Sequence, residues 1–132
     1  MSRKNFSEKR EAIYSVIRNT DTHPSSEWVY NQIKEKYPNI SLGTVYRNMS
    51  MFVKEGLIAS VGTVNGRERF DGNTAPHAHF ICKGCDAVID LHQLAYNREL
   101  DDTVFLNTGH SVENHAMFFY GICNECSKVQ QS

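Results

Sequence analysis

The sequence predicts an α+β chain made of two small domains. Three features predict it: helical periodicity in three short segments, a hairpin signal at Asn65-Gly66, and two Cys-x-x-Cys pairs in a second half with strand-like periodicity. We expect the first domain to cover residues 1–70 and the second to cover residues 77–132. The segment 71–76 is rich in turn-forming residues and is the expected hinge between the two domains.

The first domain begins with two predicted helices joined by a turn. Apolar residues recur at helical spacing over residues 7–20, and a turn at residues 22–24 follows. Either Ser25 or Ser26 is available to cap the second helix, because a serine hydroxyl accepts a hydrogen bond from the free N–H groups at a helix start. This second helix is expected to end before Pro38.

A third predicted helix begins after Ser41 and stops at Glu55-Gly56. Its apolar residues are expected to face the core; they are Leu42, Val45, Met49, Phe52 and Val53. Its opposite face carries Thr44, Arg47, Asn48, Met51 and Lys54. Two strand-like segments, Leu57–Val64 and Arg67–Phe70, then flank the hairpin signal. Three short helices and a hairpin are typical of a winged helix-turn-helix domain.

The third helix has the composition of a DNA-recognition helix, since Arg pairs with guanine, Asn with adenine, and Thr or Lys with phosphate. The predicted contacts with double-stranded DNA are made by Thr44, Tyr46, Arg47, Asn48 and, at the hairpin tip, Arg67. Residues 1–70 carry eleven Lys and Arg against seven Asp and Glu, a net charge of +4, which suits a polyanion. One copy would contact few base pairs, so a homodimer on a palindromic operator is expected. A polar face that is merely solvated is the alternative.

In the second half of the chain, apolar residues recur at the shorter spacing that is typical of strands. Strands are predicted at residues 79–82, 87–91 and 115–122, and a helix at residues 92–107. With three Lys and Arg against eight Asp and Glu, residues 71–132 carry a net charge of −5. No apolar run is long enough to cross a membrane and the N-terminus is polar, so we expect a cytoplasmic protein with no membrane partner.

All four cysteines lie in this half, as the pairs Cys82/Cys85 and Cys123/Cys126. In a reducing compartment such pairs favour a metal site over disulfides. Four thiolates complete a tetrahedral shell that suits zinc, and a shell with no open position indicates a structural site. A pair of redox-active dithiols and an iron–sulfur cluster are the alternatives.

Histidines and aspartates near the first cysteine pair suggest a second metal site. His77 and His79 alternate on a strand and therefore project from one face. Asp71 precedes them in the hinge, and Asp90 lies on the expected neighbouring strand. Together they form a plausible set of nitrogen and oxygen donors, although each residue alone is commonly just solvated.

Five motifs occur together: His23-Pro24, Thr44-Val45-Tyr46-Arg47-Asn48, Arg69-Phe70-Asp71, His77-x-His79-x-x-Cys82-x-x-Cys85 with Asp90, and Tyr120-Gly121-x-Cys123-x-x-Cys126. With these motifs the chain resembles the ferric uptake regulator (Fur) family of bacterial metalloregulators over nearly its whole length. Within that family it looks most like the peroxide-sensing PerR branch. Aspartates stand at positions 71 and 90, where the iron-sensing branch usually has glutamates.

The resemblance implies a regulatory site for Fe²⁺ or Mn²⁺, made by His23, Asp71, His77, His79 and Asp90, beside a structural Zn²⁺ on the four cysteines. Two carboxylates and three imidazoles suit these ions. It also implies a repressor that leaves DNA when iron-catalysed reaction with hydrogen peroxide oxidises His23 or His77. His92 and His110 match no ligand position, and His115 is expected to be structural.

Two other functions stay open at this stage. One is a sensor of iron, manganese or zinc on the same fold, without peroxide chemistry. The other is a non-haem iron enzyme, but the sequence shows neither an acid–base pair nor a phosphate-binding loop, and a winged-helix domain would serve no purpose in it. We therefore expect no enzymatic activity and no organic cofactor.

Overall fold

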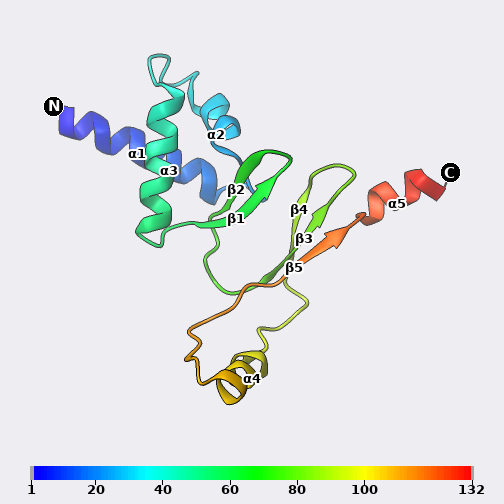
Figure 1. Ribbon diagram of the computed structural model, residues 1–132. Helices are drawn as coiled ribbons and strands as arrows, with labels where there is room; N and C mark the ends of the chain where they lie inside the picture. Colours follow the sequence, from blue (N-terminus) through cyan, green and yellow to red (C-terminus); the bar gives the residue numbers. More distant parts are fainter. Residues whose placement is uncertain (1, 132) are drawn as a thin grey trace. The chain divides into compact units, whose positions relative to one another are not determined.

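The computed structural model describes the backbone of residues 2–131 and the side chains of residues 8–128. The chain divides into two compact units: the first unit, Met1–Thr74, and the second unit, Ala75–Ser132. The elements of the first unit are α1 (Ser2–Arg18), α2 (Ser26–Ile33), α3 (Leu42–Lys54), β1 (Ala59–Val64) and β2 (Arg67–Asp71). Those of the second unit are β3 (Ala78–Cys82), β4 (Val88–Leu91), α4 (Arg98–Thr108), β5 (Phe118–Gly121) and α5 (Asn124–Gln131) (Figure 1).

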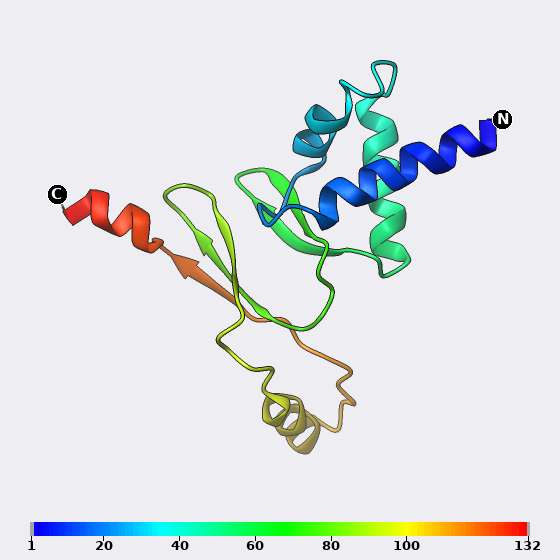
Figure 2. The same ribbon diagram turned by 180° about the vertical axis from the view of Figure 1, so that it is seen from behind.

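The three helices of the first unit pack together around an apolar core (Figure 2). Its buried side chains are Ile13, Ile17, Val29, Ile33, Ile40, Val45, Met49, Phe52, Ile58 and Phe70. Fully burying one such side chain contributes about 1.5–3 kcal/mol, so this cluster is the main source of stability in the unit. It holds one face of α3 inward and leaves the other face exposed.

Serine residues cap the starts of α2 and α3. Ser25 Oγ accepts a hydrogen bond from the backbone N–H of Trp28 at 3.2 Å, and Ser41 Oγ accepts one from Thr44 at 3.1 Å. Replacing such a cap by alanine typically costs about 1 kcal/mol. The structure confirms Ser41 as a cap and selects Ser25 over Ser26 for α2.

Two residues of α3 depart from the prediction. Val53 was expected in the core, but its side chain is 37% exposed. Asn48 was expected on the outward face, but it is 4% exposed, and its Nδ2 donates to the carbonyl oxygen of Thr44 at 2.9 Å. Because residues of a helix follow one another by about 100°, positions 48 and 53 lie at opposite edges of the buried face, each about 40° beyond its nearest buried residue. Helical spacing therefore does not distinguish the two positions, and the packing of α3 against its neighbours buries Asn48 and leaves Val53 exposed.

The predicted hairpin is present as β1 and β2. Asn65 and Gly66 have φ angles of 51° and 80°, and a two-residue turn with positive φ at both positions matches the twist of the strands it joins. The strands are antiparallel, and Val64 pairs with Arg67 next to the turn. This hairpin is the wing of the helix-turn-helix unit, with Arg67 near its tip.

In the second unit, β3 is the central strand of a three-stranded sheet. It pairs antiparallel with β4 and parallel with β5. A parallel neighbour requires a long connection, and the chain between β4 and β5 provides it through α4. The register places Cys82 of β3 beside Gly121 of β5. The carboxyl ends of both strands therefore lie at the same edge of the sheet.

The helix predicted over residues 92–107 is shorter in the structure. It begins after Asn97, whose Oδ1 accepts a hydrogen bond from the backbone N–H of Glu99 at 3.1 Å. It ends at Gly109, whose φ of 78° is the left-handed conformation of a helix terminus. Residues 94–95 therefore lie before α4 and not within it. The short helix α5 was not predicted.

The apolar core of the second unit is small. Among the described side chains, its buried hydrophobic members are Ala78, Ile81, Cys82, Val88 and Cys123. Small domains with little core usually need a disulfide, a metal or a partner for stability. Two of the five core residues are cysteines, which connects the stability of this unit to the cysteine site.

Candidate metal centres and nucleic-acid interface

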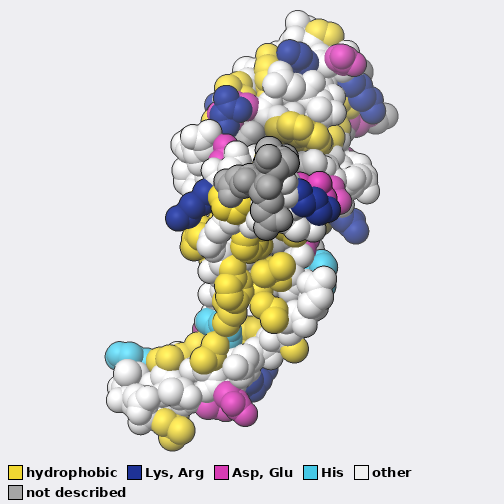
Figure 3. All heavy atoms as spheres, turned by 90° about the vertical axis from the view of Figure 1, so that its right-hand side faces the viewer, with side chains coloured by type: hydrophobic (Ala, Val, Ile, Leu, Met, Phe, Trp, Pro, Cys, Tyr) yellow, Lys and Arg dark blue, Asp and Glu magenta, His cyan; other side chains and the backbone are white. Residues whose placement is uncertain are grey.

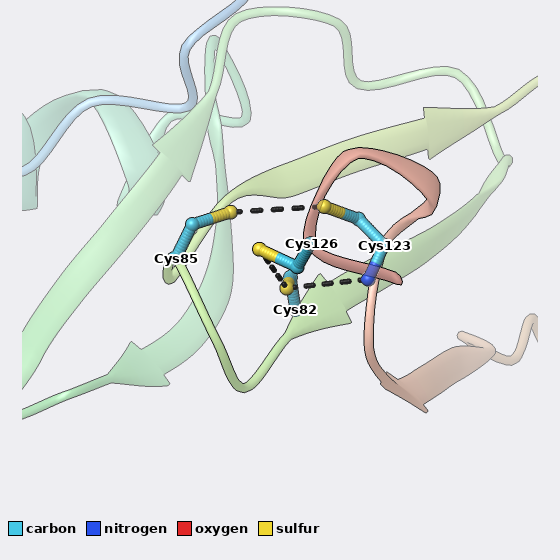
Figure 4. A group of neighbouring side chains, drawn as sticks. All are labelled: Cys82, Cys85, Cys123 and Cys126. Atoms are coloured by element: carbon cyan, nitrogen blue, oxygen red, sulfur yellow. Dashed lines mark hydrogen bonds between the residues drawn. The ribbon is translucent and has the colours of Figure 1, made fainter. Parts of the chain in front are cut away.

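The four cysteines converge at one edge of the second unit's sheet. Cys82 ends β3 and Cys85 follows in the next turn, while Cys123 follows β5 and Cys126 lies in the first turn of α5. Their side chains point toward a common centre (Figure 4). Cys82 Sγ lies 3.8 Å from Cys126 Sγ, and Cys85 Sγ lies 3.8 Å from Cys123 Sγ. The parallel pairing of β3 and β5 is what brings the two distant pairs together.

The spacing of the sulfur atoms fits a single tetrahedral metal ion. A disulfide would join two sulfurs at about 2.05 Å. Zn²⁺ binds thiolates at about 2.3 Å, which places the corners of a tetrahedron about 3.8 Å apart. In a cluster of several irons, cysteines that bind different irons lie farther apart than those on one iron. All four sulfur atoms here lie within 4.8 Å of one another, and two of the separations are 3.8 Å, which favours a single zinc ion over both a disulfide and a multi-iron cluster.

The surroundings of the four sulfur atoms stabilise the thiolate form of Cys82 and disfavour that of Cys126. The backbone N–H groups of Gly84 and Cys123 donate to Cys82 Sγ at 3.2 and 3.3 Å. These bonds, that of Cys123 first, lower the pKa of Cys82 to about 6. The pKa of Cys126 is raised to about 12, first by its contact with Cys123 and then by the other two sulfurs. Four thiolates are therefore stable together only around a cation.

Gly84 leaves the room that the sulfur atoms need. A Cβ at this position would lie 3.1 Å from Cys126 Sγ and 3.5 Å from Cys82 Sγ. Since a bound ion fixes both sulfurs, we expect Gly84→Ala to weaken zinc binding by about 10- to 100-fold. Competition with a chromogenic chelator measures this change. Lys83→Ala, an exposed side chain in the same turn, is the control. Equal zinc affinity in the native and Gly84→Ala proteins would contradict the expectation.

In the first unit, His23 lies against Asp71. His23 Nε2 is 3.3 Å from Asp71 Oδ2, and both side chains are buried. His23 has a φ of 53°, a left-handed backbone that costs an L-residue about 1–2 kcal/mol. Arg69 holds this loop to β2, because its Nη2 donates to the carbonyl of Thr22 at 2.6 Å and its Nε donates to the carbonyl of His23. The strained loop therefore has a fixed position beside Asp71.

In the second unit, His77, His79 and Asp90 form a cluster across β3 and β4. His79 pairs with Asp90 in the register of the two strands. Asp90 Oδ1 lies 2.8 Å from His77 Nε2 and 3.3 Å from His79 Nε2. The two imidazole rings have centroids 4.4 Å apart. The structure thus brings together the three donors that the sequence assigned to this half of the chain.

The hydrogen bonding of His77 suits a metal ligand. Its Nδ1 lies 2.7 Å from the carbonyl oxygen of Ala75, and a carbonyl only accepts, so Nδ1 carries a hydrogen. In the neutral ring Nε2 then has a lone pair, which faces the carboxylate oxygen of Asp90 at 2.8 Å. Two acceptors at this distance need a cation between them, either a proton or a metal ion. Ligating histidines commonly donate their other N–H to a carbonyl in this way.

The exposed face of α3 and the wing carry four of the five predicted DNA contacts. Tyr46 is 45% exposed, and Arg47 is also exposed, with its Nη2 donating to Thr44 Oγ1 at 3.1 Å. Arg67, on the wing, has a side chain that is 63% exposed. Asn48 is the exception. It is buried under this face, so its amide is not presented to a base edge in this structure, and its contact with DNA stays a prediction.

Glu27 is a residue of this face that the sequence did not indicate. Its Oε2 lies 3.8 Å from Arg67 Nε. The pKa of Tyr46 is raised, first by burial and then by a hydrogen bond to Glu27. A carboxylate of α2 therefore lies beside two predicted DNA-contacting residues. No local pattern connects these three positions, because they meet only through the packing of the helices and the wing.

His115 is held in a hydrogen-bonded network within the second unit. Its Nδ1 lies 2.6 Å from Asp101 Oδ1, and its backbone N–H donates to the hydroxyl oxygen of Tyr96 at 3.2 Å. The Tyr96 hydroxyl donates to the other oxygen of Asp101. These bonds, that of Tyr96 first, lower the pKa of Asp101. The network ties the segment before β5 to α4, which is a structural role for His115.

Known proteins match the chain over most of its length. A family model described as the ferric uptake regulator family matches residues 3–120. The peroxide operon regulator of Bacillus subtilis (strain 168) is 34% identical over 122 residues, which cover 92% of this chain and 83% of that protein. The peroxide-responsive repressor PerR of Staphylococcus epidermidis is 34% identical, covering 91% of this chain and 79% of that protein.

A solved structure with a similar fold is that of the Campylobacter jejuni peroxide stress regulator. Its TM-score is 0.76 at 25% sequence identity, and the match covers 92% of this chain and 91% of that one. The predicted fold class, a winged helix-turn-helix domain followed by a small α/β domain with a four-cysteine site, is confirmed.

Proposed function

The chain belongs to the ferric uptake regulator family, and from this premise we propose that it is a metal-dependent transcription repressor that senses hydrogen peroxide. Two relatives at 34% identity are named for their response to peroxide, which supports the proposal. The observation that carries it is the presence of nitrogen and oxygen donors in both units. The first unit supplies His23 and Asp71, and the second supplies His77, His79 and Asp90.

Two metal centres follow from these donors. Cys82, Cys85, Cys123 and Cys126 would hold a structural Zn²⁺, as the 3.8 Å sulfur separations favour. The three imidazoles and two carboxylates would hold a regulatory Fe²⁺ or Mn²⁺, because nitrogen and oxygen donors suit these ions and two carboxylates balance the charge. The first centre stabilises the second unit, and the second centre controls DNA binding.

The regulatory site would couple metal to DNA because its donors come from both units. An ion bound at once by His23 and Asp71 and by the second unit's cluster would restrict the arrangement of the two units. In a homodimer that arrangement determines the separation of the two recognition helices, which must match the spacing of the half-sites. A metal ion that binds the DNA-competent arrangement more tightly shifts the population toward it and acts as a corepressor.

Peroxide sensing depends on the histidine ligands. When bound, iron(II) would supply the one-electron chemistry that activates hydrogen peroxide beside the donor rings. Overall the peroxide oxidises an imidazole by two electrons, so that one peroxide oxygen is added to a ring carbon and the other leaves as water. We propose His23 and His77 as the targets. An oxidised ring is a poorer ligand, so the modified side chain no longer helps to join the two units. Repression then ends. Mn²⁺ supports repression without this chemistry.

The proposed DNA-binding surface is the exposed face of α3 together with the wing. Arg47 is placed to contact a base edge in the major groove, where one bidentate pair with guanine is worth about 1–3 kcal/mol of discrimination. Thr44 and Tyr46 lie beside it on α3, and Arg67 is placed to contact phosphate. Double-stranded DNA with a palindromic operator is the proposed partner.

A second copy of the chain is the proposed protein partner. The second unit exposes an unusual number of large apolar side chains for its size; they are Ile89, Leu94, Leu100, Val104, Phe105, Leu106, Phe119 and Tyr120. Figure 3 shows hydrophobic side chains gathered in a band over this unit. Contiguous apolar surface of this kind marks a protein interface, and in a homodimer it would be covered.

We propose the cytoplasm as the location, since four free thiols around a metal require a reducing compartment. Within residues 2–131 no helix combines the length and the apolar character needed to cross a membrane. Catalytic turnover is not part of the proposal.

The test is DNA binding by the Mn²⁺ and Fe²⁺ forms before and after dilute hydrogen peroxide. We expect both forms to bind the operator and peroxide to release only the iron form. Mass spectrometry should then find one added oxygen atom on the peptide of His23 or His77. The peptide of the exposed His110 serves as the internal control. Release of DNA from an unmodified iron form would instead indicate a plain metal sensor.

A further inference from the structure

His92 lies next to the metal-donor cluster of the second unit, although no sequence motif assigns it a role. It follows β4 directly and its side chain is 62% exposed. Its Nε2 is 3.6 Å from Asp90 Oδ2, and its ring centroid is 5.1 Å from that of His77. His92 therefore faces the carboxylate oxygen that is not shared by the other two histidines.

Three imidazoles of one unit thus surround one carboxylate. The distances from Asp90 oxygens to His77, His79 and His92 Nε2 are 2.8, 3.3 and 3.6 Å. An ion bound at about 2.0–2.1 Å holds neighbouring donors about 2.9 Å apart in an octahedral site and about 3.4 Å apart in a tetrahedral site. The distances of the three imidazoles from the carboxylate lie close to this range. His77 and His79 face one oxygen of Asp90, and His92 would join them through a movement of its exposed side chain.

From this geometry we propose that His77, His79, Asp90 and His92 form a four-donor site through which the second unit alone binds a divalent transition-metal ion. Three neutral imidazoles and one carboxylate suit ions such as Zn²⁺, Co²⁺ and Fe²⁺. An ordinary ion pair at an exposed histidine is worth only about 0–1 kcal/mol and does not account for three rings converging on the same carboxylate.

The exposure of His92 gives this site a regulatory role. A donor that is 62% exposed is held by few contacts and exchanges readily, whereas His77 and His79 are largely buried. The second unit would capture the ion first, and His23 and Asp71 would then replace His92 as the two units join. This second step rests on the proposed function, but capture of the ion by the second unit does not.

The experiment uses the full chain with its cysteine site filled by zinc, verified by elemental analysis, and Co²⁺ as the only added metal. The background variant is His23→Gly, which removes a first-unit donor and suits the φ of 53°. We expect it to bind one further equivalent of Co²⁺ with the intense visible absorption of four-coordinate cobalt. Adding His92→Gln should weaken this binding by at least about tenfold and remove the intense bands. Adding His110→Gln, at an exposed histidine, should change neither the affinity for Co²⁺ nor the visible absorption.

Two results would overturn the inference. One is absence of Co²⁺ binding in His23→Gly, because the second unit would then form no site of its own. The other is an unchanged affinity and spectrum when His92→Gln is added. Failure of the proposed function is a separate outcome. If the native chain shows no metal-dependent DNA binding while the cobalt results hold, the repressor proposal is wrong and the four-donor site remains.

Discussion

Cys82→Ser is expected to abolish zinc binding and to unfold the second unit while the first unit stays folded. Cys82 is fully buried and accepts hydrogen bonds from two backbone N–H groups, so it is both a ligand and a core residue. Binding of a structural zinc contributes about 10–16 kcal/mol of apparent free energy, which is comparable to the whole stability of a domain, about 5–15 kcal/mol. The small apolar core of this unit cannot replace that contribution.

Elemental analysis and hydrogen exchange measure this result. Zinc content should fall from one ion per chain to nearly none, and the amides of β3, β4 and β5 should lose protection. Those of α1, α2 and α3 should keep it, because the first unit has its own apolar core. Lys83→Ala keeps the cysteines and the backbone bond from Lys83 N–H to the carbonyl of Gly121, and should behave as the native chain. Protected β3 amides in a zinc-free Cys82→Ser protein would refute the structural role.

His23→Gly is expected to weaken operator binding in the presence of Mn²⁺ by about 5- to 150-fold, the usual range of coupling between two ligand sites. The variant removes the imidazole that faces Asp71, while glycine suits the left-handed backbone at this position. Binding of DNA without metal should not change, because the exposed face of α3 is untouched. Fluorescence anisotropy with a labelled operator, over a range of Mn²⁺ concentrations, gives the operator affinity with the metal and without it.

His110→Gly removes a histidine that is exposed and lies outside the donor clusters, so it should keep the native response to Mn²⁺. Unfolding of the metal-free proteins, followed by circular dichroism, separates a loss of coupling from a loss of fold. A native response to Mn²⁺ in a folded His23→Gly protein would show that the first unit does not contribute to the regulatory site.

Several features of this protein follow from short stretches of sequence. The start of α3 at Ser41 and the turn at Asn65-Gly66 were predicted because each depends on residues within one turn of the chain. The cysteine site was predicted because the residue type and the spacing of each pair already specify the chemistry of the ligands. The apolar spacing of α3 likewise predicted the burial of Val45 and Met49.

Tertiary structure decided the rest. The burial of Asn48, the position of Glu27 beside Tyr46, and the approach of His92 to Asp90 depend on which elements pack together. The parallel pairing of β3 with β5 has the same origin, and it alone brings the two cysteine pairs to one edge. The sequence by itself therefore determined which donors and caps this protein carries. Their meeting points are set by contacts between residues far apart in the chain, which no local periodicity encodes.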